Sequence, residues 1–503
     1  MTGRFAVTVC AVTGDDRSEA IEFFLADGSR RGAAPVGFPT GAAGGAPCGD
    51  LVRLSLRIAG GRIDAVRFDA EGCATAVAAG AATAAAVEGL AVLGAARLGP
   101  AEIEAELGGL SPQGRHAAEL AADALHRAIA AAIRGDEALI PAQADHAGDR
   151  VLVAMSGGVD SAAAAHLERE RGADVVAVTL KLWADRATDG ARSCCSPEAV
   201  VGARALAHSM GLPHLTMDLE QRFRAAVVDD FLAGHAAGRT PNPCVRCNGE
   251  LRIDAMIALA DRLGATHLVT GHYARIEHDA RGPLLVAPAD AAKDQTYMLS
   301  ALSPDSLRRL RFPLAALTKP EVRRIAAGAG LPVASRADSQ DLCFLAGQGK
   351  RAFLARHGDL VDRPGEIVDC DGAVLGTHPG QHHFTVGQRR GIGIAAAEPL
   401  YVVATDAASN RVVVGPRERL ARPAVRLRDA VLHRHGRRVN RVRLRYHARP
   451  LACRLEPIAS GPPGPGRHRE LTVRLAEPAD AVAPGQTASL LDADAVVGHA
   501  TIA

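Results

Sequence analysis

Two cysteines in the run TPNPCVRCNGE (residues 240–250) have a type and spacing that could support chemistry. Cys244 and Cys247 lie three residues apart behind a rigid Pro-Asn-Pro segment, where a helix is predicted to begin. A helix N-terminus lowers the pKa of a thiol and favours the thiolate, which is the nucleophile and the metal ligand. The pair alone fits half of a zinc site, a redox pair or the reactive sulfurs of an enzyme. A third cysteine, Cys343, lies in SQDLCFLAGQG. Three cysteines without an evident fourth ligand argue against structural zinc, which takes four.

The run SGGVDS, Ser156 to Ser161, is a second chemical signal. It follows a predicted buried strand and opens a predicted helix. Two glycines let the backbone turn tightly and point N–H groups at an anion, and the helix dipole and two hydroxyl groups add to the attraction. The run lacks the lysine of a Walker A loop. An ordinary glycine-rich turn is the alternative, but the strand–helix setting favours phosphate binding.

The elements that must position these residues fall into several domains. Alternating strand and helix patterns over residues 150–300 predict an α/β parallel sheet with helices on both faces, whose ligands bind beyond the carboxyl ends of the strands. Residues 301–365 are predicted as a small helical or mixed domain, and the short alternating runs of 366–503 predict a C-terminal β-barrel. LVRLSLRIAGGRIDAVRFDA (51–70) predicts a strand–turn–strand unit followed by helices, hence an α+β domain over 20–134. Residues 135–149 lack periodicity and are predicted to be a linker.

Composition narrows the class of protein. A chain of 503 residues is too long for one core, and because only 3% of it is aromatic, the cores must be built from Ala, Leu and Val. A net charge of +2 requires any contact with a polyanion to come from local patches. Ten cysteines are too sparse for a disulfide scaffold, which favours a reducing cytoplasm. The Ala-rich stretch 74–98 contains Glu88 and several glycines, which predicts a buried helical region and no membrane span.

Six motifs together resemble one enzyme family. AMSGGVDS, TPNPCVRCN, TGHYARI, KDQTYML, SQDLCF and HHFTVGQRRGIGI occur in this order over about 150–503, and the set closely resembles the tRNA-specific 2-thiouridylases. Its loop resembles the pyrophosphate loop of the adenine-nucleotide alpha-hydrolases. The resemblance implies that ATP, with Mg²⁺, adenylates the C2 oxygen of the wobble uridine of tRNA. Sulfur then displaces AMP. It also implies extrusion of the base, substrate tRNAs for Lys, Glu and Gln, and a cysteine desulfurase or sulfur-relay protein as donor.

The resemblance assigns roles to the cysteines by position. Cys343 matches the cysteine that carries the persulfide, and Cys247 matches the partner thiol, usually labelled the nucleophile, which can release sulfur by forming a disulfide. Cys244 stands where many relatives carry Asp. As a thiol it could join Cys247 and Cys343 in holding three corners of a [4Fe–4S] cluster. Persulfide chemistry, cluster chemistry and a passive substitution at Cys244 all stay open.

The same resemblance assigns the binding residues. The residues implied for ATP are Ala154, Met155, Ser156, Gly157, Gly158, Val159, Asp160, Ser161, Leu180 and Gly271. The residues implied for the target base or the tRNA are Asn242, Pro243, Cys244, His272, Lys293, Asp294 and Gln295. Arg389 and Arg390 in GQRRG are candidates for contacts with tRNA phosphate because of their charge. The Arg-rich stretch 421–450, in which Arg441, Arg443 and Arg445 alternate on one predicted strand face, is a further candidate for phosphate contacts.

Residues 20–134 resemble a different family, the NifU-like iron–sulfur scaffold domains, through APCGDLVRLSL, EGCATA and GRHAAELAADALHRAI. Cys48, Asp50, Cys73 and His116 fall on the metal-ligand positions of that family, which implies iron, zinc or a cluster there. Ala117 replaces the third cysteine of the family. A degenerate domain that only docks a cysteine desulfurase is the alternative. We hypothesise that this domain brings iron–sulfur or persulfide sulfur to Cys343 at the high effective concentration of a tether.

Two other functions compete with thiolation. Another AMP-forming ligase would share the SGGVDS loop but would be expected to carry a glutaminase domain or a different cysteine pattern. A non-catalytic iron–sulfur or sulfur carrier would leave the loop and the base-facing motifs unexplained.

Overall fold

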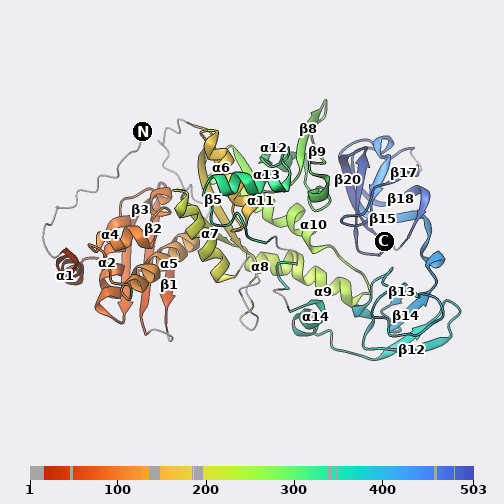
Figure 1. Cartoon of the computed structure of the whole chain (residues 1–503), viewed down its shortest axis with the longest axis horizontal. Helices are drawn as coiled ribbons and strands as arrows, with labels where there is room; N and C mark the ends of the chain where they lie inside the picture. The colour runs from red at the N-terminus through yellow and green to blue at the C-terminus, as the bar shows by residue number, and fades with distance from the viewer. Residues whose placement is uncertain are drawn as a thin grey trace.

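The structure, a computed structural model, describes residues 16–45, 49–134, 148–183, 185, 196–337, 342–345, 348–457, 461–480 and 482–503. Figure 1 shows an elongated molecule, with the N-terminal domain at one end, a parallel-sheet domain in the middle and two β-structures at the other end. The predicted multidomain architecture is therefore confirmed. Within the described residues, no helix has the length and apolar character needed to cross a membrane.

The N-terminal domain is an antiparallel sheet covered by helices. Its strands, in the order β1-β2-β3, are β1 (Thr40–Gly44), β2 (Leu51–Ala59) and β3 (Arg62–Glu71). Gly60 and Gly61, both with positive φ, make the tight turn between β2 and β3. The helices are α1 (Asp16–Ala26), α2 (Ala74–Val87), α3 (Val92–Ala95), α4 (Pro100–Glu106) and α5 (Arg115–Ala132). The helical region predicted over 74–98 is divided into α2 and α3, with Gly89, whose φ is 85°, just after the end of α2.

The parallel-sheet domain has the strand order β10-β7-β4-β5-β6. The strands are β4 (Arg150–Ala154), β5 (Asp174–Lys181), β6 (His214–Asp218), β7 (His267–Thr270) and β10 (Leu310–Arg311). The helices of this region are α6 (Val159–Glu170), α7 (Pro197–Ser209), α8 (Glu220–Phe223), α9 (Asp229–Ala236), α10 (Pro243–Cys247), α11 (Ile253–Arg262), α12 (Pro304–Arg308), α13 (Lys319–Gly328) and α14 (Lys350–Gly358). Two π-helical turns, at Arg224–Val228 and Asn248–Arg252, join α8 to α9 and α10 to α11. Short 3₁₀ turns occur at Ala291–Lys293, Gln381–His383, Arg417–Leu420 and Gly436–Arg438.

The C-terminal region contains two separate sheets. The first has the order β12-β11-β14-β13 and is formed by β11 (Gly365–Val368), β12 (Val374–His378), β13 (Tyr401–Asp406) and β14 (Arg411–Gly415). The second is a closed barrel of β15 (Arg422–Leu432), β16 (Arg441–Arg443), β17 (Leu451–Leu455), β18 (Gly466–Ala479), β19 (Thr487–Asp492) and β20 (Ala495–Ile502). It closes because β15 pairs with both β18 and β20. A hairpin of β8 (Arg275–Asp279) and β9 (Gly282–Val286) extends the barrel through β20.

The N-terminal domain is packed directly against the parallel-sheet domain. One apolar cluster includes Ile129 of α5 as well as Val176 and Leu215 of the parallel sheet. The backbone N–H of His214 donates to the carbonyl of Ala96 across the boundary at 3.0 Å. Shared apolar burial of this kind holds domains in a fixed relation. If the N-terminal domain delivers sulfur as hypothesised, it must therefore do so while packed against the parallel-sheet domain. Most of the predicted linker lies outside the described residues.

One buried ion pair in this boundary gives a testable contribution to docking. Arg204 of α7 is buried and donates to Asp123 of α5 at 3.0 Å. Loss of a hydrogen bond to a charged group costs about 1.5–3 kcal/mol, and Asp123 keeps a second partner, Arg127, after the change. We expect Arg204→Ala to lower the free energy of unfolding by that amount in urea titrations followed by circular dichroism. Arg127→Ala is the matched control, because Arg127 pairs with the same carboxylate from an exposed position, where pairs contribute at most about 1 kcal/mol. Equal losses in the two variants would contradict this account.

Candidate active site

The SGGVDS run forms a compact loop between β4 and α6. Gly157 adopts a φ of +73°, a conformation that favours glycine. The Ser161 hydroxyl donates to the carbonyl of Gly158 at 3.0 Å and accepts from the backbone N–H of Ser156 at 3.2 Å. Gly158 is the N-cap of α6. These bonds present the helix N-terminus at the carboxyl edge of the sheet, an arrangement suited to a phosphate group. We call Ser156–Ser161 the phosphate loop.

A buried lysine that the motif analysis did not single out anchors this loop. The ammonium group of Lys319, the first residue of α13, donates to both carboxylate oxygens of Asp160 at 2.8 Å. The hydroxyl of Tyr273 donates to the same carboxylate at 2.9 Å, and the Arg336 guanidinium donates to the Gly157 carbonyl at 3.0 Å. The run TKPEVRR predicts that a helix begins near Thr318, but it does not indicate what Lys319 contacts. Its partner is 159 residues away.

The other residues predicted for ATP surround the phosphate loop. Ala154 ends β4, Leu180 lies near the end of β5, and Gly271 directly follows β7. A Cβ atom on Gly271 would lie 2.7 Å from the carbonyl carbon of Asp160, so only glycine lets the β7 end approach α6 this closely. Met155 and Val159 are buried in the core beneath the loop. The predicted set thus lies around neighbouring carboxyl ends of β4, β5 and β7.

The cysteines lie beyond the same edge of the sheet. Cys247 is buried in an apolar cluster that also contains Leu182, which follows β5, and Leu219, which follows β6. Cys343 packs against this cluster next to Phe344. The two predicted sulfur-handling residues, nearly 100 positions apart in sequence, therefore share one apolar environment at the carboxyl ends of β5 and β6.

Asn242 positions the start of the cysteine helix. Its side-chain oxygen caps α10 by accepting from the backbone N–H groups of Cys244 and Val245, both at 3.1 Å. Cys244 and Cys247 are three residues apart on this short helix and so lie on the same side of it. The π-helical turn that follows Cys247 is a feature frequent at functional sites.

Two tyrosines that the motif analysis did not identify, Tyr297 and Tyr446, lie near the start of α10. Burial raises the pKa of Tyr297 to about 12, partly opposed by a hydrogen bond with Asn242. Burial also raises the pKa of Tyr446, and Asp294, Lys293 and Cys244 are near enough to influence it. Tyr446 therefore lies in the electrostatic neighbourhood of Cys244.

The remaining residues predicted to contact the base have defined structural partners. Burial and the neighbouring Arg252 lower the pKa of His272 to about 3, and this ring accepts from Arg252 at 2.8 Å. Asp294 accepts from Arg443 at 2.8 Å, and Gln295 accepts from the backbone N–H of Tyr273 at 2.9 Å. The partly buried Arg443 is therefore paired to protein, whereas the sequence pattern favoured a phosphate contact. Lys293 ends the 3₁₀ turn at Ala291–Lys293, and Pro243 is buried at the start of α10.

Two cavities open beside these elements. One, of about 410 Å³, is lined by Thr240, Gln388, Arg445 and Gln486, and so lies between the segment before Asn242, the GQRRG loop and the barrel. The other, of about 380 Å³, is lined by Arg389 and the loop that follows it. The first cavity therefore lies next to the segment that leads into the capped start of α10.

The predicted metal ligands of the N-terminal domain are only partly brought together. Cys73 donates from both its backbone N–H and its thiol to Asp50, at 2.7 and 3.3 Å. His116 instead lies 3.9 Å from Glu119 on α5. In the parts of the chain that the structure describes, Asp50, Cys73 and His116 do not form a group whose ligand atoms all lie within 4.8 Å, and neither do Cys244, Cys247 and Cys343. Cys48 lies outside the described residues.

The cap on the cysteine helix makes a prediction. Asn242→Ala removes the acceptor for two backbone N–H groups, a loss that costs about 1 kcal/mol at helix N-termini. We expect thermal unfolding to show this modest destabilisation. We expect the thiolation activity implied by the sequence motifs to fall more steeply, because the helix start also orients Cys244 and Cys247. Asn242→Asp, which keeps the acceptor, should restore stability. Full activity in Asn242→Ala would contradict a positioning role.

Protein-family models match each of the four structural parts described above. The models that match are described as "tRNA methyl transferase HUP domain" over 149–347, "tRNA methyl transferase PRC-barrel domain" over 351–416, "Aminomethyltransferase beta-barrel domain" over 431–502 and "NifU-like N terminal domain" over 26–135. Their boundaries follow the parallel sheet, the four-stranded sheet, the closed barrel and the N-terminal domain.

Individual relatives cover nearly the entire chain. The bifunctional protein NifU/MnmA of Rubrobacter xylanophilus is 46% identical over 488 residues, which cover 94% of this chain and 96% of that protein. The tRNA-specific 2-thiouridylase MnmA of Acidithiobacillus ferrooxidans is 41% identical and covers 69% of this chain and 97% of its own length. That of Rhizorhabdus wittichii is 45% identical over 70% of this chain and 91% of its own length. Since both the fused protein and the shorter enzymes align over almost their full lengths, this chain belongs to the tRNA-specific 2-thiouridylase family, in its bifunctional form with an N-terminal NifU-like domain.

Proposed function

We propose that this protein is an ATP-dependent tRNA-uridine 2-sulfurtransferase that thiolates the wobble uridine. The observation that carries the proposal is that Cys247 and Cys343 share one apolar cluster at the carboxyl edge of the sheet that bears the phosphate loop. An adenylated oxygen and a sulfur nucleophile can meet at this edge.

The proposed reaction has two steps. The uridine C2 oxygen attacks the α-phosphorus of ATP, and the α–β phosphoanhydride bond breaks with release of pyrophosphate. Terminal sulfur then attacks C2, the C2–O bond breaks, and AMP leaves with that oxygen. With a persulfide on Cys343, the Cys247 thiolate attacks the inner sulfur, and the terminal sulfur leaves to the base. A Cys247–Cys343 disulfide then remains, which a cellular thiol reductant must reduce before the next turnover.

The chain's own groups have assigned roles in this scheme. The phosphate loop would hold the pyrophosphate of ATP through backbone N–H and hydroxyl groups, with Mg²⁺ bound to the phosphate oxygens. The cavity lined by Thr240 and Arg445 would admit the extruded uridine, and Tyr446 would offer it a stacking face. Arg389, exposed on the GQRRG loop, would contact tRNA phosphate.

The route by which sulfur reaches the base is also part of the proposal. The Cys244, Cys247 and Cys343 ligand atoms do not all lie within 4.8 Å of one another, which argues against one ion held by all three but does not test a cluster, whose cysteines bind separate irons. The packing of Cys343 against the cluster of Cys247 supports the persulfide route. A [4Fe–4S] cluster on the same three cysteines is the alternative route, with sulfide on the open iron. Iron and sulfide counted in an anaerobic preparation, and again in Cys244→Ala, separate the two, because full activity without iron would exclude the cluster.

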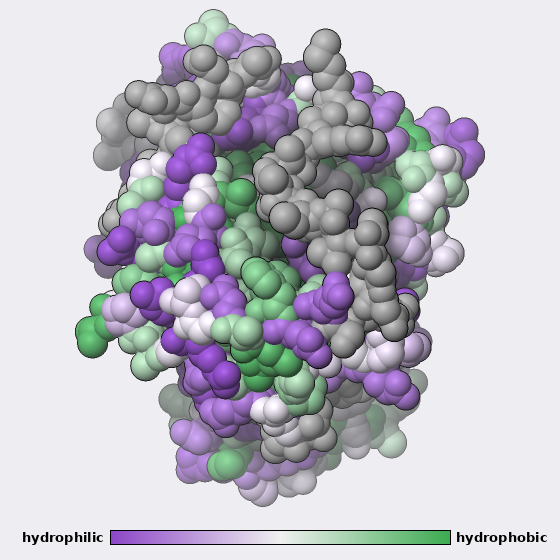
Figure 2. All heavy atoms as spheres, turned by 90° about the vertical axis from the view of Figure 1, so that its left-hand side faces the viewer, coloured by the Kyte–Doolittle hydropathy of each residue, from purple (hydrophilic) through white to green (hydrophobic). Residues whose placement is uncertain are grey.

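The N-terminal domain would receive iron–sulfur or persulfide sulfur, with iron or zinc at Cys48, Asp50, Cys73 and His116. Figure 2 shows apolar side chains gathered among hydrophilic ones on the face of the molecule at this end. Phe23, Leu25 and Val36 are the exposed large apolar residues of the domain in the described part of the chain. A cysteine desulfurase docked here is the proposed sulfur donor. We further propose a cytoplasmic location and the tRNAs for Lys, Glu and Gln as substrates.

One assay tests the proposed function. Purified protein, ATP, Mg²⁺, a persulfide donor and unmodified tRNA are incubated, and the digested nucleosides are measured by mass spectrometry. The proposal expects 2-thiouridine, together with equal amounts of AMP and pyrophosphate, and loss of all three in Asp160→Ala. Adenylation of another acceptor without thiolated tRNA would favour a different AMP-forming ligase. Sulfur binding with no ATP consumption would favour a carrier.

A further inference from the structure

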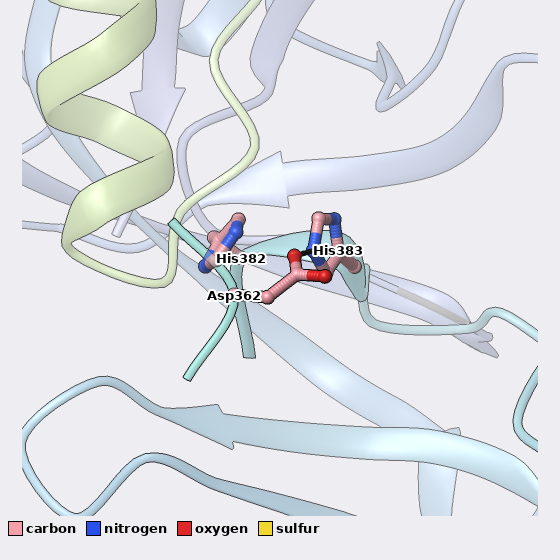
Figure 3. Close-up of side chains that lie close together, drawn as sticks. All are labelled: Asp362, His382 and His383. Atoms are coloured by element: carbon pink, nitrogen blue, oxygen red, sulfur yellow. Dashed lines mark hydrogen bonds and ion pairs between the residues drawn. The ribbon is translucent and has the colours of Figure 1, made fainter. Parts of the chain in front are cut away.

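A cluster of two histidines and one aspartate lies outside the site described above. Asp362 belongs to the segment between α14 and β11, and His382 and His383 belong to the 3₁₀ turn Gln381–His383. Each side chain offers one ligand atom, and the three atoms all lie within 4.8 Å of one another. Figure 3 shows both imidazole rings beside the Asp362 carboxylate, with His383 Nε2 hydrogen-bonded to Asp362 Oδ1 at 2.9 Å.

His382 has an unsatisfied nitrogen in this cluster. His382 is only 6% exposed, and its Nε2 atom is buried with no hydrogen-bond partner among the described residues. A buried polar atom left without a partner costs about 1–3 kcal/mol. Gly380 packs closely on the ring, since a Cβ atom there would lie 2.5 Å from His382 Cε1. The imidazole is therefore held in place while one of its nitrogens remains unused.

The chemistry of the donor set indicates which ligand would use this nitrogen. Two imidazole nitrogens and one carboxylate oxygen are the set that binds zinc and similar divalent transition metals, with one position left for water. A simple Asp362–His383 hydrogen bond would explain the pair but not the unsatisfied atom of His382.

Positively charged side chains near this cluster oppose the binding of a metal ion there. Arg351 of α14 forms an ion pair with Asp362. Lys350 and the buried His235 lie close enough to interact with the histidines. The Arg351 contact lies at an exposed carboxylate, where a divalent ion can replace it.

We propose that Asp362, His382 and His383 bind one divalent cation of the zinc class. The ion would join the segment after α14 to the turn that leads into Gln388 and Arg389 of the GQRRG loop. It would thus fix the loop predicted to contact tRNA without taking part in sulfur transfer.

The test is cobalt binding to the full-length chain. Co²⁺ serves as a spectroscopic substitute for zinc and is titrated into chelator-treated protein in a Cys48→Ser/Cys73→Ser background, which removes the thiolates predicted for the N-terminal site. The expected result is one bound Co²⁺ whose spectrum lacks thiolate-to-metal charge transfer. In the same background, His382→Ala and His383→Ala should weaken binding by more than the about 10–100-fold typical of losing an outer-shell partner.

Two further variants make the result decisive. Asp362→Asn changes an exposed side chain, so it should weaken binding while folding normally, as checked by circular dichroism. His278→Ala, which removes an exposed histidine of β8, should leave binding unchanged. Absence of Co²⁺ from the background protein, a spectrum dominated by thiolate ligands, or equal affinity in all variants would overturn the proposal. Thiolation activity is not the readout, so the result is independent of the proposed function.

Discussion

Replacement of Cys247 with serine is expected to lower 2-thiouridine formation by at least about 10³-fold, the scale of loss when a covalent nucleophile is removed. Serine is close in size, so the apolar cluster around residue 247 should stay packed. The hydroxyl cannot attack a persulfide or hold iron as a thiolate does. Formation of thiolated nucleoside is measured by mass spectrometry, and ATP–pyrophosphate exchange in the presence of tRNA is measured in parallel.

The parallel measurement separates sulfur chemistry from nucleotide chemistry. In the proposed reaction adenylation relies on the phosphate loop, so ATP–pyrophosphate exchange should remain within about tenfold of the wild-type rate when only the sulfur nucleophile is missing. Cys453→Ser is the control, because burial raises the pKa of the Cys453 thiol to about 12 and keeps it protonated. If Cys247→Ser thiolated tRNA as well as Cys453→Ser does, Cys247 would not be the nucleophile.

Replacement of Lys319 with methionine is expected to lower thiolation by about 10²-fold, the cost of misplacing a reacting group by about 1 Å. Lys319 holds both carboxylate oxygens of Asp160 from a buried position, and Asp160 lies in the first turn of the helix that follows the phosphate loop turn. Methionine keeps most of the side-chain volume and removes the charge. We expect both ATP–pyrophosphate exchange and thiolation to fall, in contrast to Cys247→Ser.

A neighbouring residue on the same helix controls for effects on α13. Arg324 is 76% exposed in its side chain and lies 3.8 Å from Glu321, so Arg324→Met should leave the kinetics unchanged. Steady-state kinetics with ATP as the varied substrate show whether Lys319→Met changes kcat, KM or both. Identical kinetics in the two methionine variants would rule out an anchoring role for Lys319.

Local sequence determined the elements that carry chemistry. The phosphate loop follows from glycines and hydroxyl residues between an apolar strand and a helix, and its internal hydrogen bonds span no more than five residues. The capped start of the cysteine helix follows from Asn242 and Pro243 in the same way. Such features are predictable because backbone geometry and capping depend on neighbours in sequence.

Tertiary structure alone decided which of these elements meet. The Lys319–Asp160 contact, the packing of Cys343 against the cluster of Cys247, and the docking of α5 on β6 each join segments that are 80 or more residues apart. The division of 366–503 into an open sheet and a barrel depends on the pairing of β15 with β20. Chain topology and shared apolar burial set these pairings, and no local periodicity encodes them. The sequence of this protein therefore determined its family and its reactive groups, whereas the fold decided the anchor of the phosphate loop, the fixed place of the N-terminal domain and the Asp362–His382–His383 cluster.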